Sequence, residues 1–188
     1  MNILILGGGG REHALAWAVK QNPKCDRLIV APGNAGIAQM AEVAQIDILD
    51  GATVVTFCEE NAIDFVIVGP EAPLAAGVAD ATRAAGITTF GPSAAAARLE
   101  ASKAFTKEIC DACAAPTAGY ARFTEPTPAK DYIHAKGAPI VVKADGLAAG
   151  KGVIVAMTVA EALAAIDDMF GGEFGAAGAE VVIEEFMT

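Results

Sequence analysis

The chain has 188 residues, enough for one large domain or two small domains that each bury a core. Its 23 acidic residues outnumber 13 basic ones, and the net charge of −10 disfavours nucleic acid while still allowing a small phosphorylated ligand in a local basic pocket. The hydrophobic fraction of 54% rests largely on alanine, and each apolar run is shorter than the roughly 18 to 20 residues that cross a bilayer. The first residues, MNILILGGGG, also lack the basic region of a signal peptide. We therefore expect a cytoplasmic protein without a membrane or nucleic-acid partner. A monomer is a further expectation, which does not follow from composition.

In the first half of the chain, short apolar runs alternate with stretches of helical period. Strands are predicted at residues 3–6, 28–31, 65–68 and 87–90, and helices at about 12–21, 51–61 and 74–85. Strands that are apolar on both faces belong in a buried parallel sheet. The alternation predicts an α/β domain, with a Rossmann-like doubly wound parallel sheet, over residues 1–101.

The pattern changes after a helical connector that includes EASKAFTK. Strands are predicted at residues 117–123, 140–143, 153–156 and 181–183, and helices at 127–136 and 158–170. This order of hairpin and helices is α+β, over residues 102–188. We expect the last predicted strand, 181–183, to lie unpaired at an exposed sheet edge.

The C-x-x-C pair formed by Cys110 and Cys113 follows a helical pattern rather than a strand-to-helix turn. A redox or zinc site is therefore disfavoured, and we interpret the four cysteines as ordinary thiols of a reducing compartment.

The segment GGGGREHAL lies between the first predicted strand and helix. It fails the dinucleotide spacing G-x-G-x-x-G, because the third glycine would fall at Glu12 or His13. The backbone N–H groups of Gly9 and Gly10 and the helix N-terminus still favour an anion, and Arg11 adds a phosphate donor. A sugar phosphate fits this better than a dinucleotide. The alternative is a tight turn with capping Arg and Glu side chains on the surface.

Two further turns follow predicted strands, PGNAG and GPEAPL. In an open α/β sheet such turns meet at the carboxyl edge, where ligands bind. Glu71 could accept hydrogen bonds from ribose hydroxyls or a substrate amine, or it could be a surface carboxylate at a helix start. Asn34 could contact a ligand, or it could simply tolerate a left-handed turn.

The stretch VVKADGLAAGKGV combines a strand lysine with a glycine loop. A P-loop is excluded, because three residues rather than four separate Gly146 from Gly150, and Gly152 rather than Ser or Thr follows Lys151. Lys143 lies in a strand that is otherwise apolar, and a buried ammonium is costly without an anionic partner. We therefore expect Lys143 to bind an anionic ligand. Lys103, in an ordinary helical pattern, is uninformative alone, and so is the acidic strand end at 184–187.

Taken together, seven motifs give the chain a resemblance to one known family. They are GGGGREHAL, PGNAG, GPEAPLAAG, GPS with EASKAFTK, PTAGY, KADGLAAGKGV and VVIEEF, in this order over essentially all 188 residues. This pattern resembles the phosphoribosylamine-glycine ligase (glycinamide ribonucleotide synthetase) family of the ATP-grasp superfamily. Other ATP-grasp enzymes share the strand lysine and the glycine loop but are not expected to share the first and third motifs. The departures are small: Ile37 stands where Thr is expected, and Ala115 where Ile is expected.

The resemblance implies a pre-ATP-grasp domain followed by an incomplete ATP-grasp domain. It implies the ligation of glycine to 5-phosphoribosylamine with ATP, giving glycinamide ribonucleotide, ADP and phosphate in de novo purine biosynthesis. The expected amino-sugar phosphate site comprises Gly9, Gly10, Arg11, Glu12, His13, Asn34 and Glu71. The expected ATP site comprises Lys103, Lys143, Gly146, Gly150, Lys151, Gly152, Glu184, Glu185, Phe186 and Met187.

The family uses Mg²⁺ or Mn²⁺, and the resemblance places those ligands outside the 188 residues. Glu184 and Glu185 are adjacent on a predicted strand, so their side chains point to opposite faces and cannot both hold one ion. We expect this N-terminal portion to be inactive alone. The alternatives are a noncatalytic ATP-binding module and, in a further class, a Rossmann oxidoreductase.

Overall fold

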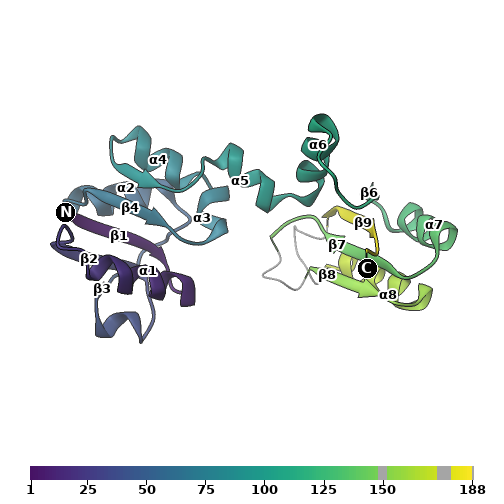
Figure 1. Ribbon diagram of the computed structural model, residues 1–188, viewed down its shortest axis with the longest axis horizontal. Helices are drawn as coiled ribbons and strands as arrows, with labels where there is room; N and C mark the ends of the chain where they lie inside the picture. Colours follow the sequence, from purple (N-terminus) through teal and green to yellow (C-terminus); the bar gives the residue numbers. More distant parts are fainter. Residues whose placement is uncertain (148–151, 173–178, 188) are drawn as a thin grey trace. The chain divides into compact units, whose positions relative to one another are not determined.

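The computed structural model describes residues 1–147, 152–172 and 179–187 of the chain. It divides into two compact units, Met1–Ala97 and Arg98–Thr188, and each unit has its own sheet (Figure 1). Among the described residues, no helix is long and apolar enough to span a membrane.

The first unit is built on a parallel sheet with the strand order β3-β2-β1-β4-β5. Its strands are β1 (Asn2–Gly7), β2 (Arg27–Pro32), β3 (Glu42–Val43), β4 (Phe65–Val68) and β5 (Thr88–Phe90). Its helices are α1 (Gly10–Lys20), the 3₁₀ helix η1 (Ile37–Gln39), α2 (Gly51–Glu60), α3 (Glu71–Ala75), α4 (Val78–Ala84) and the start of α5 (Ala94–Ala101). The order reverses at β1, so the turns that follow β1, β2 and β4 meet at one edge of the sheet.

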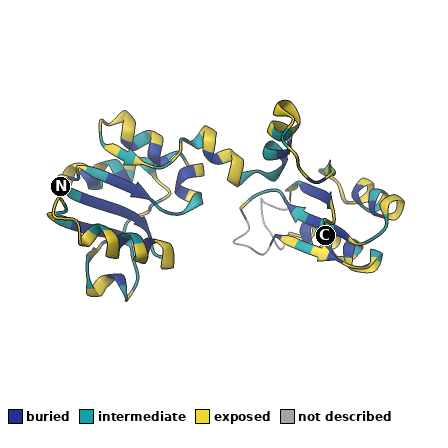
Figure 2. Cartoon of the chain, viewed as in Figure 1, coloured by how far each residue is buried: buried dark blue, intermediate teal, exposed yellow. Residues whose placement is uncertain are grey.

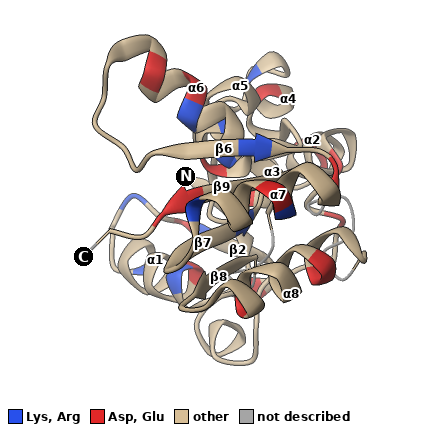
Figure 3. Cartoon of the chain, turned by 90° about the vertical axis from the view of Figure 1, so that its right-hand side faces the viewer, with Lys and Arg blue, Asp and Glu red and all other residues tan. Residues whose placement is uncertain are grey.

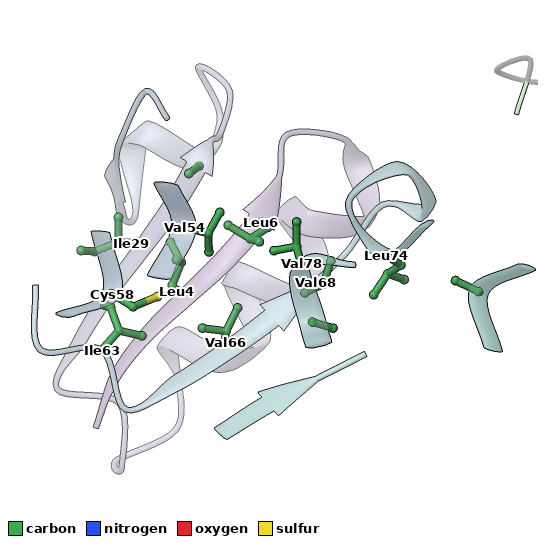
Figure 4. Packing of buried hydrophobic residues seen from close by; sticks show 13 residues of the cluster. Leu4, Leu6, Ile29, Val54, Cys58, Ile63, Val66, Val68, Leu74 and Val78 are labelled. Atoms are coloured by element: carbon green, nitrogen blue, oxygen red, sulfur yellow. The ribbon is translucent and has the colours of Figure 1, made fainter. Parts of the chain in front are cut away.

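Both faces of this sheet are buried, as the apolar strands predicted. Leu4 and Leu6 on β1 pack with Val54 of α2 in one core cluster (Figure 4). Ile5 points to the opposite face and packs in a second cluster with Ala16 of α1. Because alternate residues of one strand fill two cores, the sheet lies between helices, and the predicted doubly wound fold is confirmed.

The single helix predicted at 74–85 is wrong in detail. The chain instead forms α3 and α4, which are separated at Gly77, where φ is +84°. A residue with a Cβ rarely adopts this conformation, so glycine allows the break between the helices. The short strand β3 was not predicted, since two residues carry too little pattern to read.

The second unit is α+β, as predicted. Its helices are α6 (Lys103–Cys113), α7 (Pro126–Lys136) and α8 (Val159–Phe170), and its strands are β6 (Tyr120–Phe123), β7 (Ile140–Ala144), β8 (Val153–Ala156) and β9 (Val181–Glu185). The described strands form an antiparallel sheet with the order β6-β9-β7-β8. The predicted edge position of residues 181–183 is therefore wrong, because β9 pairs with β6 on one side and with β7 on the other. These residues are fully buried, which suits a central strand.

The two faces of this sheet differ in what packs against them. One face packs against α7 and α8, with Ile133 and Ile166 among its core residues. The pairing register defines the opposite face, which we call the α6 face. Its residues include Val141, Lys143, Val153, Val155, Val182 and Glu184. Val153 and Val155 are 44% and 51% exposed, and β8 carries exposed residues in Figure 2. The α6 face therefore presents an accessible apolar surface beside charged side chains.

Candidate functional site

In the first unit, the turns after β1 and β4 close around the buried side chain of Glu12. Glu12 Oε2 accepts a hydrogen bond from the backbone N of Gly9 at 2.7 Å, which caps the start of α1. A Cβ on Gly69 would collide with the Glu12 carboxylate. Glu12 is 4% exposed, so the alternative of a capping glutamate on the surface is wrong. Its Oε1 is buried and accepts no hydrogen bond within the described part of the chain, although Arg11 Nε lies 3.4 Å away.

Arg11 and Glu71 come together above these turns. Both terminal guanidinium nitrogens of Arg11 donate to Glu71 Oε1 at 3.1 Å. Hydrogen bonds from its own backbone N–H and from Arg11 lower the pKa of Glu71. The two side chains are 59% and 41% exposed, so both remain accessible to a ligand. The fold thus brings two predicted site residues from distant motifs into direct contact.

Asn34 ties two of the turns to each other. Its Nδ2 donates to the Gly8 carbonyl at 2.8 Å, and its Oδ1 accepts from the N–H groups of Gly36 and Ile37 at 2.9 Å. Asn34 does not adopt a positive φ, so the left-handed-turn interpretation is wrong. A Cβ on Gly36 would lie 2.7 Å from the ring of His13, which places His13 against the same turn.

In the second unit, Asp145 joins the end of β7 to the start of α6. Its carboxylate accepts from the Ala104 backbone N at 2.6 Å and from Ser102 Oγ at 2.9 Å. Ser102 Oγ in turn accepts from the Phe105 backbone N at 3.0 Å as the helix N-cap. These bonds satisfy N–H groups that the first turn of a helix leaves free. Sequence reasoning did not single out Asp145, although it lies inside a recognised motif.

Lys103 is positioned by this junction. Its Nζ donates to the carbonyl oxygens of Asp145 and Gly146 at 3.2 and 3.1 Å. Burial lowers the pKa of Lys103, and the nearby charge of Lys143 lowers it further, while Asp145 opposes the shift. The two lysines singled out in the sequence therefore lie near each other beside the first glycine of the loop.

Lys143 belongs to a largely buried cluster of charges with Glu184 and Lys107. Glu184 Oε2 accepts from Lys143 Nζ at 2.7 Å, and Glu184 Oε1 lies 3.5 Å from Lys107 Nζ. Glu184 is thus an anionic partner for Lys143 within the chain itself, so the position of Lys143 does not by itself require a ligand, and anion binding by Lys143 stays a prediction. Lys107 was missed, although its spacing of four residues from Lys103 places both on one helix face. Figure 3 shows the basic and acidic segments of this unit.

The remaining predicted ATP-site residues lie on both sides of the glycine loop and after β9. Gly152 closes the loop, because its carbonyl accepts from the Ala144 backbone N at 2.8 Å. Glu185 points away from Glu184 and accepts from the Gly119 backbone N at 2.8 Å. Phe186 and Met187 are 36% and 66% exposed. Gly150 and Lys151 lie outside the described residues.

Within residues 1–147, 152–172 and 179–187, no three His, Cys, Asp or Glu side chains form a group that could hold a metal ion.

Comparison with known families decides the assignment. Residues 1–100 match the family described as "Phosphoribosylglycinamide synthetase, N domain", and residues 101–188 match "Phosphoribosylglycinamide synthetase, ATP-grasp (A) domain". The chain belongs to the phosphoribosylglycinamide synthetase family. It is 63% identical over 187 residues to the phosphoribosylamine–glycine ligase of Agrobacterium fabrum and 59% identical over 190 residues to that of Vibrio cholerae. All of this chain but only 44% of each relative is covered, so the chain spans less than half of their length. The resemblance read from the motifs is confirmed.

Solved structures agree with this assignment. The phosphoribosylamine–glycine ligase of Thermotoga maritima matches with a TM-score of 0.80 and 28% identity, over 100% of this chain and 44% of that chain. The biotin carboxylase domain of Hydrogenobacter thermophilus 2-oxoglutarate carboxylase matches with a TM-score of 0.77 and 18% identity, over 99% of this chain and 44% of that chain. The second match shows a shared fold alone.

Proposed function

We propose that the chain is the N-terminal portion of an enzyme of the synthetase family that ligates glycine to 5-phosphoribosylamine. The products are glycinamide ribonucleotide, ADP and phosphate, within de novo purine biosynthesis. The observation that carries the proposal is the match of both family domains, in order, across the whole chain. We assign residues 1–101 to the amino-sugar phosphate and residues 102–188 to ATP, in a monomeric protein of the cytoplasm.

The second unit would bind ATP on its α6 face. Lys103 and Lys143 supply positive charge for the phosphates, and the glycine loop that contains Gly146, Gly150, Lys151 and Gly152 covers them. Segment 184–187, with Glu184, Glu185, Phe186 and Met187, holds the adenine partly through backbone atoms, because the carboxylates of Glu184 and Glu185 already pair within the chain. The convergence of Lys103 and Lys143 near the start of the loop supports this division. The exposed side chains of Val153 and Val155 offer apolar surface to the nucleoside beside the lysines.

The first unit would bind the phosphoribosyl group at the turns after β1 and β4. The backbone N–H of Gly10 and the exposed guanidinium of Arg11 face the phosphate, and Gly9 lines the turn while its own N–H donates to Glu12. Glu71 accepts hydrogen bonds from the sugar or its amine. Glu12, His13 and Asn34 hold the turns in place, which their buried or backbone-directed contacts support. The Oε1 atom of Glu12, which accepts no hydrogen bond within the described residues, lies at this site.

The proposed reaction requires the protein to neutralise phosphate charge and to position the reacting groups. The γ-phosphoryl group of ATP passes to a carboxylate oxygen of glycine, giving glycyl phosphate and ADP. The amine of phosphoribosylamine then attacks the carbonyl carbon, the new C–N bond forms, and phosphate leaves. Lys103 and Lys143 offset the negative charge of the phosphates, and Arg11 fixes the sugar phosphate. Mg²⁺ neutralises phosphate charge when it is bound, and we place its ligands outside this chain.

Calorimetry on the purified chain tests the proposal. We expect separate binding of ATP with Mg²⁺ and of ribose 5-phosphate, and no binding of NAD. NAD binding alone would contradict the family assignment of function, whereas ATP binding without sugar-phosphate binding would favour the noncatalytic ATP-binding module. We expect no glycine-dependent release of ADP until the chain is extended by the remaining part of its relatives. Comparable turnover by the chain alone would refute our placement of the metal site.

A further inference from the structure

Lys107 is a charged residue buried in the second unit, where an ammonium group is costly unless polar or anionic groups surround it. Its side chain is 6% exposed. Nζ donates to Thr117 Oγ1 at 2.7 Å and to the Ala118 carbonyl at 2.9 Å, and it lies 3.5 Å from Glu184 Oε1. Two of these contacts are hydrogen bonds and the third is an ion pair. The contacts of the Lys107 ammonium are therefore with groups of the chain itself.

Glu184 is shared between two lysines from different elements. Its Oε1 faces Lys107 of α6, and its Oε2 faces Lys143 of β7 at 2.7 Å. The Glu184 side chain is 10% exposed, whereas that of Lys143 is 25% exposed. With one carboxylate between two ammonium groups, the cluster retains one positive charge. Lys143, the more exposed of the two lysines, is the group that can present this charge to an anion.

We propose that Lys107 is a positioning residue for the candidate ATP site. By holding Glu184 Oε1, it fixes Oε2 and so the direction of Lys143. It also supplies the countercharge for Glu184, which leaves the charge of Lys143 for phosphate. If Lys107 were absent, Glu184 would neutralise Lys143 alone, and the cluster would attract an anion far less. This inference rests on the proposed function, because it assigns ATP to Lys143.

The test compares Lys107→Met with Lys130→Met in the full chain. Lys130 is the matched control, because it also pairs with a carboxylate, Asp167 at 2.5 Å, but joins α7 to α8. We expect Lys107→Met to weaken ATP binding about tenfold or more in calorimetry, and Lys130→Met to change it by less than about twofold. In a Glu184→Gln background, Lys107→Met should change ATP binding by less than about twofold, because Lys107 acts through the Glu184 carboxylate.

Several outcomes would overturn the inference. A folded Lys107→Met variant with wild-type ATP affinity would mean that Lys107 has only a structural role. An undiminished loss of affinity from Lys107→Met in the Glu184→Gln background would mean that Lys107 acts independently of Glu184. If Lys107→Met does not fold, Lys107→Gln takes its place with the same expectations. If the wild-type chain binds no ATP, the proposed function is wrong, and the charge cluster is tested by the free energy of unfolding instead.

The losses of unfolding free energy in the Lys107 and Lys143 variants should then be non-additive, and they should become additive in a Glu184→Gln background. Additivity in the wild-type background would refute the shared carboxylate.

Discussion

Replacement of Asp145 by alanine should destabilise the second unit by about 3 kcal/mol. The change removes two hydrogen bonds to a carboxylate, from the Ala104 backbone N at 2.6 Å and from Ser102 Oγ at 2.9 Å. Bonds to a charged group contribute about 1.5 to 3 kcal/mol each, and the negative charge at a helix N-terminus adds about 0.5 kcal/mol. The sum is reduced because the site is partly exposed and water can replace one partner. Asp145→Asn keeps an acceptor oxygen and should cost about 1 kcal/mol.

The assay is urea unfolding with a separate probe for each unit. Amide resonances of β7 and β9 report on the second unit, and fluorescence of Trp17, the single tryptophan, reports on the first. We expect the second-unit midpoint to fall in Asp145→Ala while the Trp17 midpoint stays constant. Asp167→Ala, which removes an exposed carboxylate in the same unit, is the control and should cost less than about 1 kcal/mol. An unchanged second-unit midpoint, or an equal loss in Asp145→Asn, would refute the role of the carboxylate as acceptor.

Three further predictions follow from exposure and charge. Arg11→Ala should weaken ribose 5-phosphate binding by about 1.5 to 3 kcal/mol and leave ATP binding nearly unchanged in calorimetry; equal losses for both ligands would contradict separate sites. Burial raises the pKa of Cys58 to about 11, so at pH 8 mass spectrometry should find iodoacetamide on the exposed Cys113 well before Cys58, and equal rates would contradict this burial. Burial lowers the pKa of Lys103 in the folded chain below its unfolded value of 10.5. At a pH between the folded and unfolded pKa, the unfolded chain binds more protons, so the contribution of Lys103 to the free energy of unfolding rises with pH. Phosphate raises this pKa again, so ATP binding in that window should take up protons, seen as a buffer-dependent enthalpy; an enthalpy independent of the buffer would count against Lys103 at the phosphates.

The first unit was readable from the sequence because its signals are local. Strands such as 3–6 are apolar on both faces, and this pattern specifies a buried parallel sheet without knowledge of the partners. The limit appears at Gly77, where one glycine splits a helical pattern that alanine continues on both sides. The turn residues were identified, but the contact between Arg11 and Glu71 depends on strand order and could not be derived from either motif alone.

The second unit shows where local reading fails. Lys107 looks like a solvated helix lysine, and only the approach of Thr117 and Glu184 makes it a buried one. Glu184 looked like the end of an edge strand for the same reason, since the pairing of β9 with both neighbours is set by residues far apart in the chain. Charge networks and strand order are long-range properties, whereas sequence pattern reports short-range ones.

The central place of β9 has a consequence for synthesis. In the described sheet, β6 and β7 are both joined to β9 rather than to each other, so the sheet stays in two pieces until residues 181–185 have left the ribosome. At about 5–20 residues per second, several seconds separate the completion of β7 from that of β9. Through this interval the β7–β8 hairpin presents an apolar strand edge while the first unit is already free to fold. A nascent chain that stalls there joins a folded first unit to an incomplete second unit with an exposed, aggregation-prone strand edge. A chaperone that acts on this protein would bind it during that interval.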